Sequence, residues 1–160
     1  MSITTVGIVG AGTMGNGIAQ ACAVCGVNVV MVDISEQAVA KGLATVAGSL
    51  DRLLKKEKIT AADKEAALSR IKGSTSYDDL KAAQLVIEAA TENYELKVKI
   101  VKQLDALLAP EVILATNTSS ISITKLAAVT GRADRFIGMH FFNPVPMMAL
   151  VELIRGLQTS

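Results

Sequence analysis

The stretch Thr4-Thr-Val-Gly-Ile-Val-Gly10-Ala-Gly12-Thr-Met-Gly15 joins a short β-branched run to a glycine-rich turn. The glycines follow the spacing G-x-G-x-x-G, and the acidic residue Asp33 stands 23 positions after Gly10. A strand, a glycine turn, a helix and a second strand ending in a carboxylate form the first βαβ unit of a dinucleotide-binding domain. The pattern therefore predicts this unit over residues 1–33, although the glycines by themselves would be a weak signal.

Each glycine of this turn has a separate physical task. Gly10 permits the tight turn, Gly12 lets the backbone approach a pyrophosphate, and Gly15 lets the helix lie close to the strand. The helix N-terminus then presents unpaired N–H groups and the positive end of its dipole to the phosphates. We expect this cofactor loop, residues 10–15, to bind the dinucleotide through Gly10, Gly12, Thr13, Met14 and Gly15.

Asp33 indicates which dinucleotide is bound. At the end of the second strand its carboxylate can accept a hydrogen bond from the ribose 2′-OH, and it would repel a 2′-phosphate. None of the seven residues after Asp33 is Arg or Lys, so we predict NAD rather than NADP. Proteins that bind FAD or SAM share the glycine pattern, so only residues further along the chain can exclude them.

Strand and helix patterns alternate along the rest of the chain, which predicts a doubly wound, Rossmann-type α/β fold with a mainly parallel sheet. The expected strands are 4–9, 28–32, 85–89, 112–115, 135–141 and 149–154, the last one an antiparallel edge. The expected helices are 14–25, 36–56, 61–71, 94–108 and 123–129. Ser35 and Thr60 are the expected caps of two consecutive helices, which predict a helical hairpin that projects from the sheet.

The composition fits one domain of 160 residues with 51% hydrophobic residues and an aliphatic core, since aromatics are only 3%. A net charge of +1 gives no electrostatic reason to expect nucleic acid or an anionic membrane as a partner. No charged residue precedes Asp33, but five glycines between residues 7 and 17 interrupt that stretch and no basic segment begins it. We therefore expect neither a signal peptide nor a membrane span, and a cytoplasmic protein.

Cys22 and Cys25 form a C-x-x-C pair, which occurs in redox and zinc sites. Zinc needs two further ligands, and the chain has one His and no other Cys. Ile18, Cys22 and Cys25 share one helical face, so we expect the cysteines to pack on the sheet and no metal to be bound.

His140, the single histidine, falls near the end of a predicted strand, where open α/β sheets place their ligands. If residues 149–154 fold back around a turn centred on Pro146, residues 140 and 152 lie opposite each other. Glu152 could then hold one ring nitrogen and leave the other to accept a proton from an alcohol. A hydrogen-bonded structural histidine beside a solvated glutamate remains the alternative.

Asn117, Ser119, Ser120 and Asn143 are polar residues expected at strand ends. They could face a ligand there. Helix capping or turn formation would explain them equally well.

Several stretches resemble the 3-hydroxyacyl-CoA dehydrogenase family, which includes 3-hydroxybutyryl-CoA dehydrogenases. They are Val6–Gly15, Glu88-Ala-Ala-Thr-Glu92, Ala115-Thr-Asn-Thr-Ser-Ser120, and His140-Phe-Phe-Asn-Pro-Val-Pro146 with Leu150-Val-Glu152. The resemblance implies the reversible, NAD-dependent oxidation of a short-chain (S)-3-hydroxyacyl-CoA to the 3-ketoacyl-CoA.

The same resemblance implies roles for individual residues. His140 is the general base, Glu152 its partner, and Ser119 lies by the substrate oxygen. Glu92, Lys97 and Asn143 contact NAD, and we include Asn117 with them. Ser49 and Lys56 on the long helix contact CoA, although lysines at a helix end also favour the helix dipole.

Members of the family continue into a helical C-terminal domain that makes a homodimer and covers the acyl chain. We therefore expect residues 1–160 to be the NAD-binding domain of a longer enzyme. Two rival functions remain: another Rossmann oxidoreductase, such as a hydroxyisobutyrate-type enzyme, and a non-catalytic NAD-binding protein like the related lens crystallins.

Overall fold

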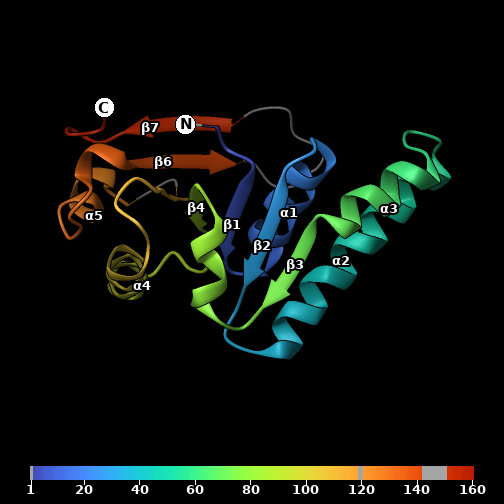
Figure 1. The fold of residues 1–160 in the computed structure, drawn as a ribbon, viewed down its shortest axis with the longest axis horizontal. Coiled ribbons are helices and arrows are strands. Elements are labelled where there is room, and N and C mark those ends of the chain that lie inside the picture. Colours follow the sequence, from blue (N-terminus) through green and yellow to red (C-terminus); the bar gives the residue numbers. More distant parts are fainter. Residues whose placement is uncertain (1, 119–120, 142–150) are drawn as a thin grey trace.

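A seven-stranded sheet organises the protein in this computed structural model, which describes residues 2–118, 121–141 and 151–160 (Figure 1). The strand order is β3-β2-β1-β4-β5-β6-β7. All neighbours pair in parallel except β6 and β7, which are antiparallel. The strands are β1 (Thr5–Val9), β2 (Asn28–Val32), β3 (Ile71–Ser74), β4 (Leu85–Glu88), β5 (Ile113–Thr116), β6 (Phe136–Phe141) and β7 (Val151–Arg155). The doubly wound α/β fold with an antiparallel edge is confirmed.

Helices cover both faces of the sheet, as a parallel sheet requires. They are α1 (Thr13–Val24), α2 (Glu36–Lys55), α3 (Ala61–Ser69), α4 (Tyr94–Leu107) and α5 (Ile123–Ala127), with 3-10 turns η1 (Tyr77–Ala82) and η2 (Ala133–Arg135). On one face α1 and α2 bury Ile18 and Val46 against strand residues such as Ile8. On the other face α4 and α5 bury Leu104 and Leu126. Within the described residues, no helix combines the length and the apolar character that crossing a bilayer demands.

The expected helical hairpin is present, with α2 and α3 extending to one side of the sheet (Figure 1). Both expected caps are confirmed: Ser35 accepts from the Ala38 N–H, and Thr60 forms a reciprocal capping box with Asp63. Near its first turns α2 lies close to the cofactor loop. A Cβ at Gly42 would come within 2.7 Å of the Ala11 carbonyl oxygen, so a glycine is needed at this contact.

Strand β3 was not expected. The helix predicted over residues 61–71 ends at Ser69, and Ile71 already pairs with Val29 of β2. The sequence of β3 is Ile-Lys-Gly-Ser, which is short and has no apolar alternation, so main-chain pairing with β2 defines it rather than its side chains. Any side chain at Gly73 would collide with Val39 of α2, so the glycine lets the hairpin lie on the sheet edge.

The cysteine expectation is only half right. Cys22 is half-buried and packs against the core, and burial, followed by the nearby Cys25, raises the pKa of its thiol to about 11. Cys25 is exposed and lies at the C-cap of α1, one residue beyond the helix. The Cys22 thiol therefore stays protonated and unreactive near neutral pH.

Arg132 is a buried cation that closes the C-terminal end of α4. Its guanidinium donates to Asp105 Oδ1 (2.7 Å) and to the carbonyl oxygens of Asp105, Leu108, Ala109 and Val112 at 2.8–3.0 Å. These acceptors include carbonyls that a helix end leaves without an intrahelical partner. One side chain thus completes the helix end and joins it to the segment leading into β5.

We predict that Arg132→Met lowers the free energy of unfolding by about 3 kcal/mol, because it strands several buried acceptors and an aspartate. Urea unfolding followed by circular dichroism measures the change. Arg135→Met is the matched control, since exposed Arg135 makes one bond to the Glu111 carbonyl oxygen (3.0 Å). Equal losses in the two variants would contradict the structural role of Arg132.

Candidate functional site

The cofactor loop lies where the strand order reverses, between β1 and its two neighbours β2 and β4. Ligands of open α/β sheets bind at such a point, beyond the carboxyl ends of the strands. Gly10 has a φ of +112°, which other residues rarely adopt. A Cβ at Gly15 would collide with the Gly10 carbonyl oxygen, so the sequence permits this close approach of α1 to β1 only through glycine.

Gly12 leaves the approach to the end of α1 open. It is the N-cap of α1, and no side chain caps the helix there. A Cβ at this position would meet nothing within 4 Å. The first turn of α1 also contains no acidic residue that would compete with an anion. The loop therefore fits a pyrophosphate, which would take the free N–H groups and face the positive end of the helix dipole.

Asp33 is bonded to the cofactor loop. Its Oδ2 accepts from the Ala11 N–H (2.8 Å), and its Oδ1 accepts from the Ile34 N–H (2.7 Å). A pocket of about 260 Å³ adjoins it and is also lined by Gly12, Thr13 and Lys41. Lys41 is the eighth residue after Asp33 and was not expected here from the sequence. Ala38 lines the same pocket, and Lys41 follows it by three positions, so both lie on one face of α2.

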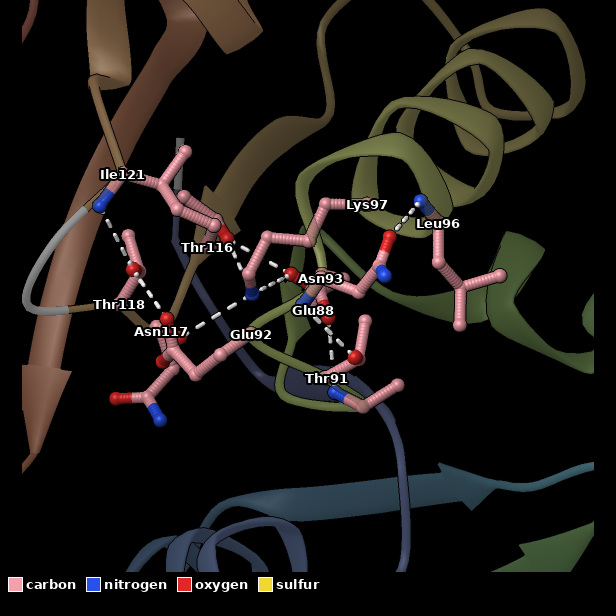
Figure 2. A network of polar contacts seen from close by, with 11 residues as sticks. Glu88, Thr91, Glu92, Asn93, Leu96, Lys97, Thr116, Asn117, Thr118 and Ile121 are labelled. Atoms are coloured by element: carbon pink, nitrogen blue, oxygen red, sulfur yellow. Dashed lines mark hydrogen bonds and ion pairs between the residues drawn. The ribbon is translucent and has the colours of Figure 1, made fainter.

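A buried ion pair lies between α4 and the ends of β4 and β5 (Figure 2). The Lys97 ammonium pairs with Glu88, and both side chains are almost completely buried, at 0% and 1% exposure. Lys97 Nζ also donates to Thr116 Oγ1 (3.2 Å) and to the Asn117 carbonyl oxygen (3.3 Å). All three of its protons therefore have an acceptor, which offsets the cost of burying the charge.

Glu88 is satisfied just as fully. Its Oε1 accepts from the Thr116 hydroxyl (2.8 Å), and its Oε2 accepts from the Ala90 N–H (2.8 Å). We call Glu88, Lys97, Thr116 and Asn117 the buried brace. Sequence analysis gave no role to Glu88 beyond the resemblance, although an acid that ends an apolar strand and precedes a helical lysine by nine residues was a usable signal.

Lys97 and Glu92, both expected at the cofactor, lie in different settings. The Lys97 side chain is buried and donates its hydrogen bonds within the buried brace. Its contact with NAD stays a prediction. Glu92 is exposed and accepts from the Thr118 hydroxyl (2.8 Å), which in turn accepts from the Ile121 N–H (3.2 Å). Glu92 thus joins the loops that follow β4 and β5, where a ligand would bind.

His140 lies in β6, and its partner in β7 is Glu152, as the symmetry about residue 146 predicted. That register is confirmed. The turn between the two strands, with Asn143 and Pro146, lies outside the described residues, as do Ser119 and Ser120. Their proposed contacts therefore stay predictions.

Asn117 and the two CoA candidates also have defined places. Asn117 is buried, at 8% exposure, and its Oδ1 accepts from the Phe141 N–H (3.1 Å). Ser49 is half-buried on α2, and Lys56 is the exposed C-cap of that helix. Seven residues separate them, which puts both on one face of the helix, toward the tip of the hairpin. Over the ranges that the structure describes, no three His, Cys, Asp or Glu side chains gather as a metal site would need.

Comparison with known proteins shows the family. Residues 5–160 match the model of the 3-hydroxyacyl-CoA dehydrogenase NAD-binding domain. The chain is 53% identical over 158 residues to a 3-hydroxybutyryl-CoA dehydrogenase of Bradyrhizobium diazoefficiens, covering 99% of this chain and 54% of that relative. It is 48% identical over 153 residues to the same-named protein of Clostridioides difficile, covering 96% and 54%. The chain thus spans about half the length of the curated relatives it matches.

Solved structures agree in fold over nearly the whole chain. The crystal structure of (S)-3-hydroxybutyryl-CoA dehydrogenase from Ralstonia eutropha has a TM-score of 0.98 and 81% identity, covering 99% of this chain and 56% of that one. That of 3-hydroxybutyryl-CoA dehydrogenase from Escherichia coli has a TM-score of 0.97 and 42% identity, covering 100% and 34%. NAD, which the glycine pattern alone did not separate from FAD or SAM, is confirmed as the cofactor of this domain.

We predict that Asp33→Asn lowers the preference for NADH over NADPH by about tenfold, the worth of one charge-assisted hydrogen bond. Asn keeps an acceptor for the Ala11 N–H but no longer repels a 2′-phosphate, and Lys41 lines the same pocket. Fluorescence titrations with both nucleotides give the two dissociation constants. An unchanged ratio would reject the ribose role of Asp33.

We also predict that Lys97→Met or Glu88→Gln alone costs about 3–5 kcal/mol of unfolding free energy, because each leaves a buried partner unpaired. The double variant should recover part of this loss, since no charge is then left alone. Chemical denaturation of all four proteins gives the coupling energy. Lys81→Met, which breaks the exposed pair with Asp78, is the control and should have little effect. Strictly additive losses would show that the two charges do not depend on each other.

Proposed function

This chain belongs to the 3-hydroxyacyl-CoA dehydrogenase family, and from that membership we propose that it serves the reversible oxidation of an (S)-3-hydroxyacyl-CoA to the 3-ketoacyl-CoA. We propose a short acyl chain, 3-hydroxybutyryl-CoA, because the similar proteins of Bradyrhizobium diazoefficiens and Clostridioides difficile are named for that substrate. The acyl-CoA is thus inferred from relatives about twice as long as this chain.

The observation that carries the proposal is the pairing of His140 with Glu152 at the carboxyl end of β6. Residues directly opposite in an antiparallel pair have side chains close together on one face. We infer that the Glu152 carboxylate holds one nitrogen of the His140 imidazole and thereby orients the other. An imidazole oriented in this way can act as a general base toward an alcohol.

In the oxidation, His140 accepts the proton of the 3-hydroxyl group while the hydrogen on C3 leaves with its electron pair. NAD, held at the cofactor loop, supplies the acceptor for that hydride. The products are the 3-ketoacyl-CoA, NADH and a protonated His140. In the reverse direction the same imidazolium returns the proton to the carbonyl oxygen. Ser119 and Asn143 are proposed to lie by the substrate oxygen and the nicotinamide, respectively.

CoA is proposed to run along α2, with contacts from Ser49 and Lys56. The shared helical face of these residues supports this, because an extended ligand could touch both across two turns. Lys56 is exposed and able to pair with a phosphate. We further propose that the complete enzyme is a homodimer with a helical second domain, and the greater length of its relatives supports the second domain.

The direct test is the loss of NADH absorbance when acetoacetyl-CoA is added. In the complete enzyme, oxidation of NADH supports the reaction class. NADH binding without oxidation would instead favour a non-catalytic NAD-binding protein. Oxidation with a free 3-keto acid but not with its CoA ester would favour another Rossmann oxidoreductase.

We predict that His140→Ala and Glu152→Gln each lower kcat by at least about 100-fold, the usual contribution of a general base. The dissociation constant of NADH should stay close to its wild-type value, because neither residue belongs to the cofactor loop. Steady-state kinetics with acetoacetyl-CoA and fluorescence titration with NADH measure the two quantities. Full activity in either variant would refute the dyad.

A further inference from the structure

We propose that Asn117 is a positioning residue for His140, and that its side chain acts in place of a main-chain partner that β5 does not provide. The inference rests on the proposed function, in which His140 is the base. It also changes the expectation for Asn117, which was grouped with the cofactor contacts.

The sheet pairing leaves the end of β6 without β5. The β5–β6 register runs from Leu114↔Phe136 to Thr116↔Gly138 and stops there. Strand β6 continues for three more residues, to Phe141, and His140 is among them. On its other side this segment pairs with β7. On the β5 side, the described residues show no main-chain pairing of the segment from Met139 to Phe141 with β5.

The Asn117 carboxamide acts at this gap. Its Oδ1 accepts from the Phe141 N–H (3.1 Å). A side chain from the segment after β5 thus holds the end of β6, beyond the point where the pairing of β5 with β6 stops. The Phe141 nitrogen and the His140 carbonyl carbon belong to one planar peptide unit. A bond that fixes this N–H therefore restrains the peptide plane that follows the His140 Cα, and with it the backbone from which the imidazole extends.

Asn117 is itself held rigidly by the buried brace. Its N–H donates to the Glu88 carbonyl oxygen (2.8 Å), and its own carbonyl oxygen accepts from Lys97 Nζ (3.3 Å). Figure 2 shows the Lys97 side chain reaching from α4 to this point between the ends of β4 and β5. The brace thus connects α4 to β6 through Asn117, and an internal ion pair is linked to the placement of the base.

The test compares Asn117→Leu with Asn117→Asp in the complete enzyme. Leu has a similar shape but cannot accept the Phe141 N–H, whereas Asp keeps an acceptor in either protonation state. For Asn117→Leu we expect kcat to fall about 10- to 100-fold, as for other small misplacements of a reacting group, with the NADH dissociation constant unchanged. Asn117→Asp should restore most of kcat.

Gln84→Leu is the matched control. The Gln84 carboxamide oxygen also accepts main-chain N–H groups across the sheet, from Thr4 and Thr5 at 2.9 Å, but at the opposite, amino-terminal edge. Its loss should lower the melting temperature and leave kcat unchanged. If Gln84→Leu lowers kcat as much as Asn117→Leu, Asn117 has only a general structural role and the proposal is overturned.

Two other results would also overturn it. An increase in the NADH dissociation constant with kcat unchanged at saturation would make Asn117 a cofactor ligand. An unchanged kcat in Asn117→Leu would make the bond irrelevant to the base. If Asn117→Leu does not fold, Asn117→Ala replaces it and is judged by the same criteria. The smaller Ala side chain leaves room for a water molecule to accept from the Phe141 N–H, so this buried donor is not left without a partner.

Failure of the proposed function would be seen separately. If the wild-type enzyme oxidises no NADH with acetoacetyl-CoA, the proposed reaction is refuted. The placement of His140 can still be measured by NMR. The imidazole signals of His140 should then shift in Asn117→Leu and stay in place in Gln84→Leu. Unshifted signals in Asn117→Leu would reject the positioning role itself.

Discussion

The ion pair between Glu88 and Lys97 is the interaction on which the arrangement of the site depends. Both charges are removed from water, so neither is tolerated without the other and without acceptors for every proton. This requirement fixes the first turns of α4 against the ends of β4 and β5. The loops that follow those strands carry Glu92 and Thr118, and the loop after β4 passes beside the cofactor loop, since a Cβ at Gly10 would lie 2.9 Å from the Ala90 Cα. The buried pair thereby helps to determine where the loops after β4 and β5 lie.

Much of this protein could be predicted from local sequence, because the features concerned are themselves local. The cofactor loop follows from glycine spacing and from the need for close approach, which Gly10 and Gly15 satisfy in the structure. The hairpin follows from two capped helices in succession. The pairing of His140 with Glu152 followed from the expectation that the last strand folds back antiparallel about Pro146, which makes residues 140 and 152 opposite each other.

The features that sequence analysis missed depend on partners far along the chain. Lys97 was expected at the cofactor from the family resemblance, and its burial was missed because lysines are usually solvated. That burial depends on Glu88 and Thr116, which lie on two other elements. Arg132 was overlooked for the same reason, since its acceptors lie 20 to 27 residues away. Strand β3 has too few apolar residues to be predicted from its sequence, and it forms through main-chain pairing with the edge of β2. In each case tertiary context overrides the local preference.

The contact between Gly42 and Ala11 gives the helical hairpin a mechanical property. It lies near the base of α2, directly on the cofactor loop, and Lys55 at the other end of the helix is 13 positions further along. At 1.5 Å per residue this length is about 20 Å, and a helix is stiff over that distance. A tilt of α2 by a few degrees about this contact therefore moves the far end of the helix by about an ångström. A displacement of the cofactor loop and a displacement of the hairpin tip are therefore linked geometrically through one stiff helix.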